Sequence, residues 1–119
     1  MSLARPEHTR ELLMLPTTRI INLRDAAAVA AARADGTLVR VDRRTRWGNP
    51  YRIGRDGTRA EVIRRYATYV LTRSDLLADL PHLRGRVLAC WCAPAPCHAE
   101  VLRDLADQAT PDTPPDGSR

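Results

Sequence analysis

The sequence predicts a small α/β domain with a three-layer, Rossmann-like architecture and a short, mainly parallel sheet. Three apolar runs of strand length occupy residues 19–23, 37–41 and 86–91, and helix-like segments separate them. Strands that alternate with helices favour a parallel sheet with right-handed crossovers. The third run is apolar on both faces, which is typical of a central strand covered on both sides.

The first two strands enclose a helix whose ends are both marked in the sequence. Asp25 can cap an alanine-rich helix over residues 26–34, because its carboxylate accepts hydrogen bonds from the first free N–H groups. Gly36 follows this helix, and glycine readily adopts the left-handed conformation that ends a helix. The second strand then leads into a basic loop over residues 42–51.

Two further helices are expected before the third strand. Thr58 and Glu61 form a capping-box pattern, which predicts a helix over residues 58–72. Apolar side chains at helical spacing place one stripe of this helix toward the core, namely Val62, Tyr66, Tyr69 and Val70. A shorter helix is expected over residues 74–83, interrupted by Pro81.

One folded domain is expected over residues 18–108, and its last helix covers residues 98–108. The segment before it, residues 1–17, is predicted to be irregular. Residues 109–119 form a polar, proline-rich tail, and this composition is typical of disorder.

The composition favours an anionic partner and gives no sign of a membrane-spanning segment. The formal net charge is +5, which favours nucleotides, nucleic acid or other phosphates. All 19 basic residues are Arg, so a compositional bias lowers the meaning of any single one. No apolar run approaches the roughly 20 residues that span a bilayer. The three cysteines are too clustered to join distant segments, so we expect reduced thiols and a cytoplasmic location.

Two polar loops are expected to meet at one edge of the sheet. Ligands of open α/β sheets bind beyond the carboxyl ends of the strands. A Trp-Gly-Asn-Pro loop over residues 47–50 follows the second strand, and a Cys/His loop over residues 90–98 follows the third. If the two strands are parallel, these loops can share one pocket.

The Trp-Gly-Asn-Pro loop has turn chemistry, because Gly48 and Asn49 tolerate positive φ and Pro50 fixes the next residue. One interpretation is a structural turn with Trp47 as a plug. The other is a nucleoside or nucleotide site, in which Trp47 and Tyr51 offer aromatic faces and Asn49 reads a polar edge. Phosphate contacts would then come from nearby arginines, namely Arg43, Arg44 and Arg46.

A bound metal is one interpretation of the Cys/His loop. Zinc accepts a set of three sulfurs and one nitrogen, here Cys90, Cys92, Cys97 and His98. An iron–sulfur cluster on the three cysteines is another. The spacing is unusual for zinc, because an extended strand separates the Cβ atoms of Cys90 and Cys92 by roughly 7 Å. A metal site therefore requires the strand to break at Trp91.

A reactive thiol is the other interpretation. Pro96 suits the start of a helix, which places Cys97 at the N-terminal end of the last helix. The helix dipole is expected to lower the pKa of this thiol, and His98 can assist as an acid or base. The free N–H groups of a helix start also attract anions. Cys90 can equally be a small buried hydrophobic residue, as cysteines often are.

The two motifs together resemble a small bacterial and phage domain family of unknown function. The resemblance rests on Trp47-Gly-Asn-Pro-Tyr51, on the helix with Arg64 and Tyr66, and on the stretch from Leu83 to Leu102, which contains Cys-Trp-Cys-Ala-Pro-Ala-Pro-Cys-His. It implies the fold and the site residues and supplies no reaction. Where family members often carry a Gly-Arg pair before the first motif, this chain has the run Arg40-Val-Asp-Arg-Arg.

The leading hypothesis is a cytoplasmic α/β domain whose pocket binds or processes a small anionic ligand, such as a nucleotide or nucleoside derivative. Cys97 and His98 are the candidate catalytic residues. The candidate ligand-binding residues are Arg46, Trp47, Gly48, Asn49, Pro50 and Tyr51. Two alternatives stand beside it: a structural zinc or iron–sulfur domain without catalysis, and an arginine-rich accessory protein that binds nucleic acid.

Overall fold

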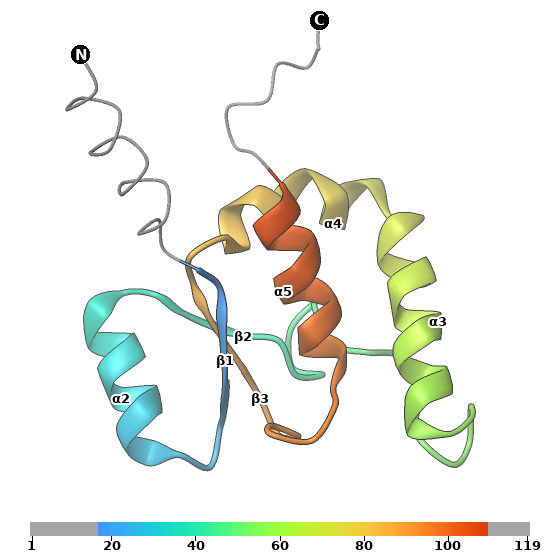
Figure 1. Cartoon of the computed structure of the whole chain (residues 1–119), viewed down its shortest axis with the longest axis horizontal. Coiled ribbons are helices and arrows are strands. Elements are labelled where there is room, and N and C mark those ends of the chain that lie inside the picture. The colour runs from blue at the N-terminus through green and yellow to red at the C-terminus, as the bar shows by residue number, and fades with distance from the viewer. Residues whose placement is uncertain (1–16, 110–119) are drawn as a thin grey trace, which may run out of the picture.

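The computed structural model describes residues 17–109. Within this part, three parallel strands form one sheet in the order β1-β3-β2, with helices on both sides (Figure 1). The strands are β1 (Arg19–Asn22), β2 (Leu38–Arg40) and β3 (Val87–Cys90). The mixed α/β fold with a parallel sheet is therefore confirmed. The predicted irregular segment 1–17 and the predicted disordered tail 109–119 lie almost wholly outside the described residues.

The central position of β3 follows from its sequence. All four of its residues are buried, and Leu88 pairs with Ile20 of β1 on one side and Val39 of β2 on the other. The sequence predicted a strand that extends to Trp91, but β3 ends at Cys90. The pairing of β3 with both neighbouring strands also ends there. Its last partner in β2 lies opposite Ala89, and its last partner in β1 lies opposite Cys90.

Helix α2 (Ala26–Asp35) connects β1 to β2 and packs against both strands. Asp25 caps its start, where the carboxylate accepts a hydrogen bond of 3.1 Å from the Ala28 N–H group. Gly36 ends it in the left-handed conformation, with φ of 73°. Both predicted ends are confirmed, and the helix is one residue longer than expected.

Helix α3 (Arg59–Leu71) begins with the predicted capping box. The Thr58 hydroxyl accepts from the Glu61 N–H group at 3.2 Å, and the Glu61 carboxylate accepts from the Thr58 N–H group at 2.7 Å. Two free N–H groups at the helix start are thereby satisfied. Three members of the predicted apolar stripe are fully buried, namely Val62, Tyr66 and Val70, while Tyr69 is half-buried.

The helix expected over residues 74–83 is divided in two. It consists of α4 (Ser74–Asp79) and a 3-10 turn, η1 (Leu80–Leu83), which contains Pro81. Proline has no N–H group and its ring crowds the preceding turn, so the regular helix ends before it. The short pieces still bury three leucines, namely Leu76, Leu80 and Leu83.

Helix α5 (His98–Gln108) has the predicted bounds and packs against β1, β3 and α3. Figure 1 shows α2 on one side of the strands and α5 on the other, with α3 beside α5. The far end of α5 is tied to the start of the domain, because the Thr18 hydroxyl donates to the Asp107 carboxylate at 2.7 Å. No helix within residues 17–109 has the length and apolar character to cross a membrane.

Candidate functional site

The two polar loops meet at the carboxyl edge of the sheet, as the sequence predicted. They enclose a pocket of about 360 Å³, a volume in the range typical of small-molecule sites. The loop after β2 contributes Asp42, Arg43, Arg44, Asn49, Tyr51 and Ile53. The end of β3, the loop after it and the start of α5 contribute Cys90, Trp91, Cys92, Pro96, Cys97 and His98. Helix α3 closes one side with Arg59, Val62 and Ile63.

The Trp-Gly-Asn-Pro loop divides between this pocket and the core. Asn49 and Tyr51 line the pocket. Trp47 does not: its side chain is only 5% exposed and belongs to the hydrophobic core, so the expected open aromatic face is absent. The core holds it there because the buried Tyr66 hydroxyl donates to the Trp47 carbonyl at 2.6 Å.

Three other predicted ligand-binding residues, Arg46, Gly48 and Pro50, line a neighbouring, more open hollow. Arg46 lies over the Trp47 ring, 5.1 Å from its centroid, and forms an ion pair with Asp79. This guanidinium is therefore occupied by Asp79 and does not line the pocket that contains the cysteines.

Gly48 is required by a close approach of two backbone segments. A Cβ atom at this position would lie 2.5 Å from the Arg43 Cα atom and 2.8 Å from the Asp42 carbonyl oxygen. Contacts this short do not occur without a shift of the backbone. The glycine therefore lets the loop fold back on the segment that follows β2, and this fold positions Asn49.

Asn49 connects the loop to helix α3 through both ends of its amide. Its Nδ2 group donates to the Val62 carbonyl at 3.1 Å, and its Oδ1 atom accepts from the Tyr51 N–H group at 2.9 Å. The side chain is 7% exposed. These two bonds fix the pocket wall, because they join the loop to helix α3.

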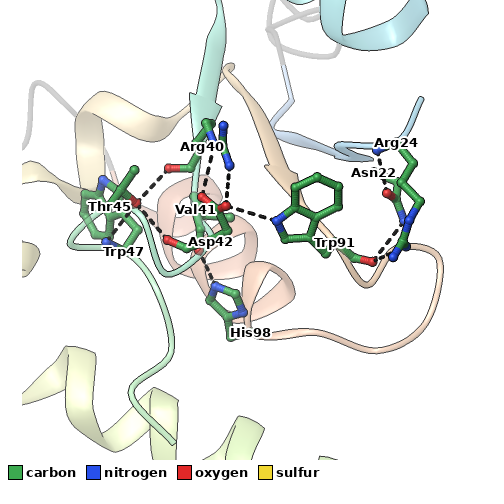
Figure 2. A network of polar contacts seen from close by, with 9 residues as sticks. All are labelled: Asn22, Arg24, Arg40, Val41, Asp42, Thr45, Trp47, Trp91 and His98. Carbon is green, nitrogen blue, oxygen red and sulfur yellow. Dashed lines mark hydrogen bonds and ion pairs between the residues drawn. The ribbon is translucent and has the colours of Figure 1, made fainter. Parts of the chain in front are cut away.

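Cys97 and His98 form a contact at the start of α5. The Cys97 Sγ atom lies 3.3 Å from His98 Nδ1 and accepts from the Ala99 N–H group at 3.5 Å, so Cys97 is the cap of the helix. His98 Nε2 lies 2.5 Å from the Val41 carbonyl oxygen, and Figure 2 shows the ring directed at that carbonyl. The sequence prediction that Cys97 stands at the helix start is confirmed.

The Val41 carbonyl determines the tautomer of His98. A carbonyl oxygen only accepts hydrogen bonds, so Nε2 carries the hydrogen. In the neutral ring, Nδ1 then holds a lone pair, which faces the Cys97 Sγ atom at 3.3 Å. Burial lowers the pKa of His98 below its usual value, although the hydrogen bond to Val41 opposes this shift. A neutral imidazole with Nδ1 facing a thiol is the arrangement of a general base beside its nucleophile.

The pKa of Cys97 differs from the sequence-based expectation. A hydrogen bond with the Cys90 thiol and burial raise the pKa of Cys97, and they outweigh the bond from the helix N–H group. The bond from Cys97, with the N–H groups of Cys92 and Ala93, lowers the pKa of Cys90 to about 6. The expectation of a lowered pKa at Cys97 was therefore wrong, because two buried thiols in contact cannot both ionise readily. The position of Cys97 at the helix start therefore does not lower the pKa of its thiol.

Positive charge surrounds the pocket. Arg43 donates to the carbonyls of Asn49 and Tyr51 at 3.0 and 3.1 Å, and Arg59 donates to the Pro96 carbonyl at 2.9 Å. Arg44 is exposed at the same wall. Asp42 is the sole carboxylate among the lining residues, and its charge is balanced by Arg40. The net electrostatic environment favours an anion.

Asp42 and Trp91 are site residues that the sequence analysis missed. The Asp42 carboxylate is 7% exposed and accepts from the Arg40 guanidinium at 2.5 Å and from the Trp91 indole at 3.1 Å (Figure 2). The hydrogen bond from Arg40 lowers the pKa of Asp42. One signal was present in the sequence: Arg40 and Asp42 stand two residues apart at a strand end, which puts them on one face.

The four expected metal ligands lie around the pocket, yet they do not form a coordination set. Within residues 17–109, no group of three or more His, Cys, Asp or Glu side chains is arranged to hold a metal ion. Both ring nitrogens of His98 already have partners, Cys97 and Val41. Cys90, Cys92 and Cys97 are free thiols.

The fold and the pocket define a small α/β domain with a Cys/His site at the carboxyl edge of a parallel sheet. The chain belongs to the family described as a domain of unknown function, DUF4326, whose model matches residues 24–108. The match confirms the expected membership in a family without an assigned function, and it covers both loops of the pocket.

A curated relative extends the comparison to viruses. An uncharacterised protein of Acanthamoeba polyphaga mimivirus is 35% identical over 48 residues, which are 40% of this chain and 36% of the viral protein. The chain thus matches little more than a third of that relative's length. No solved structure gives a significant match.

The low pKa of His98 predicts a loss of stability in mild acid. The unfolded chain binds a proton at His98 near pH 6.5 and the folded chain only at lower pH, so the free energy of unfolding falls as the pH drops below about 6.5. Its slope from this residue is at most about 1.4 kcal/mol per pH unit. Denaturant unfolding from about pH 6 to about pH 5 measures it, and a comparison of matched variants removes the contribution of Cys90 and of the carboxyl groups, which the variants share.

The matched variants are His98→Gln and His82→Gln, since the His82 side chain is 79% exposed. We expect the slope to flatten in His98→Gln and to persist in His82→Gln. Equal slopes in both variants would contradict a buried, neutral His98.

Proposed function

We propose that the pocket binds a small anionic ligand, in particular a nucleotide or nucleoside derivative, and that Cys97 and His98 act on it. The observation that carries the proposal is the meeting of a thiol–imidazole contact with a basic wall in one pocket. The location fits as well, because ligands of open parallel sheets bind at the carboxyl edge. Three free thiols also suit the reducing conditions of a cytoplasm.

The anionic part of the ligand is assigned to the side of the pocket with Arg44 and Arg59. Guanidinium groups bind phosphate and carboxylate oxygens with charge-assisted hydrogen bonds, which are stronger than neutral ones. Arg43 contributes charge and is also occupied in holding the loop together. Asp42 adds little repulsion, because Arg40 neutralises it.

Cys97 is assigned the role of nucleophile and His98 that of general base. The thiol proton passes from Sγ to Nδ1 as the sulfur forms a bond to an electrophilic carbon of the ligand, and the bond from that carbon to a leaving group breaks, with its electron pair departing on the leaving group. The Val41 carbonyl holds the ring in the required tautomer and would stabilise the imidazolium that forms. This is the division of labour of a nucleophile, a base and an orienting group, with a backbone carbonyl as the third member.

Binding is tested by calorimetry with nucleoside monophosphates, the unphosphorylated nucleosides and inorganic phosphate. We expect the monophosphates to bind, and to bind about tenfold more weakly in Arg44→Ala and in Arg59→Ala, because each removes a charge-assisted contact worth about 1.5 kcal/mol or more. Arg103→Ala is the matched control, since Arg103 lies outside the pocket and pairs with Asp104. Failure of every anion to bind, or unchanged binding in both pocket variants, contradicts the proposal.

The reactive pair is tested with an electrophilic nucleotide, 6-chloropurine ribonucleoside 5′-monophosphate. The sulfur forms a bond to C6 of the purine, chloride leaves, and the thiol proton is taken up by His98. Mass spectrometry is expected to locate the adduct on Cys97, with a rate that falls at least tenfold in His98→Gln. Cys92→Ser serves as the control and should keep the rate. Cys92 also lines the pocket, but the contact with His98 Nδ1 is made by Cys97.

An adduct on Cys90 or Cys92, or a rate unaffected by His98→Gln, would overturn the assignment of Cys97 and His98. A folded protein that forms no adduct would also overturn this assignment.

A further inference from the structure

Trp91 is an exposed aromatic side chain at the rim of the pocket. Its side chain is 47% exposed, whereas Trp47 is 5% exposed. Four large apolar residues are strongly exposed within the described part of the chain, and two of them, Trp91 and Ile53, line this pocket. Half of these exposed apolar side chains therefore lie at the site, where polar side chains would be expected if the pocket bound only an inorganic ion.

The indole of Trp91 is held in one orientation. Its Nε1–H group donates to the Asp42 carboxylate at 3.1 Å, and Arg40 fixes that carboxylate from the other side (Figure 2). Its backbone carbonyl accepts from Asn22 Nδ2 at 3.2 Å. The guanidinium of Arg24 lies 5.5 Å from the ring centroid. A ring that is both exposed and fixed can bind a second ring without losing further side-chain freedom.

We propose that Trp91 is the stacking platform for a planar aromatic ring of the ligand, such as a nucleobase. This proposal rests on the proposed function, since it assigns the second end of the same ligand. The anionic group reaches Arg44 and Arg59, and the ring lies between the Trp91 indole and the apolar side chain of Ile53. All four residues line the one pocket, whose volume of about 360 Å³ is suited to a mononucleotide.

Asp42 has a positioning role in this arrangement. Its carboxylate forms an ion pair with Arg40 and accepts a hydrogen bond from the Trp91 indole. The hydrogen bond fixes the orientation of the Trp91 ring, and the ion pair neutralises the charge that would repel the phosphate. The aromatic contact that the sequence suggested for Trp47 is thus transferred to Trp91, on the opposite loop.

The experiment compares nucleoside monophosphates with ribose 5-phosphate, which carries the anion without the base. Calorimetry measures the affinity, and tryptophan fluorescence reports whether a base lies against the Trp91 ring. We expect AMP, GMP, CMP and UMP to bind at least tenfold more tightly than ribose 5-phosphate, because stacking on an aromatic side chain is worth about 1–3 kcal/mol per base. The bases should quench the exposed tryptophan, and this change should vanish in Trp91→Phe.

Two variants separate stacking from folding. Trp91→Ala is expected to weaken nucleotide binding about tenfold or more and to leave ribose 5-phosphate binding unchanged, which also shows that the pocket is intact. Trp91→Phe keeps a ring and should retain most of the affinity.

Each remaining outcome overturns a defined part of the account. If ribose 5-phosphate binds as tightly as the nucleotides, or if Trp91→Ala binds nucleotides as well as the unaltered protein, the platform is refuted while the anion pocket stands. If neither class of compound binds, both the platform and the proposed function fall.

Discussion

The hydrogen bond between His98 Nε2 and the Val41 carbonyl is the contact on which the candidate site depends. It joins the end of β2 to the start of α5, two segments that are 57 positions apart in the chain. Because a carbonyl accepts only, it places the hydrogen on Nε2 and leaves Nδ1 as a base toward Cys97. The geometry of the sheet and the chemistry of the pocket are thus set by the same bond.

The parallel sheet makes this bond attainable. Both β1 and β2 pair with β3 in parallel, so the loops after β2 and β3 leave the sheet at one edge. Gly48 lets the first loop fold tightly, and Asn49 fastens it to α3. Cys97 begins α5 by capping it with its own sulfur. Each local feature restricts the freedom of the pocket wall before any ligand arrives, which is how a site becomes preorganised.

The features that the sequence predicted well depend on local chemistry. The capping box of α3, the Asp25 cap, the buried central strand and the helix start at Cys97 each require only neighbouring residues, and all four are observed. The shared edge of the two loops also followed, because it is a consequence of strand direction alone. The site could therefore be placed on the sheet without knowledge of its contacts.

The features that the sequence could not predict depend on contacts between distant segments. Trp47 and Trp91 have equal apolar character, and only the three-dimensional packing makes the first a core residue and the second a rim residue. The pKa of Cys97 follows the helix dipole in a sequence argument, but its contact with Cys90 reverses the direction. The hydrogen bond from the Trp91 indole to Asp42 could not be predicted, because the two residues lie 49 positions apart in the chain.

The measurement that tests the account most directly is ¹⁵N NMR of the imidazole nitrogens in histidine-labelled protein, with His98→Gln to assign the resonances. We expect His98 to be neutral near pH 7, with the hydrogen on Nε2 and a lone pair on Nδ1. A hydrogen on Nδ1 in the neutral ring, or an imidazolium at that pH, would contradict it. Either result would remove the base that the Cys97 thiol requires.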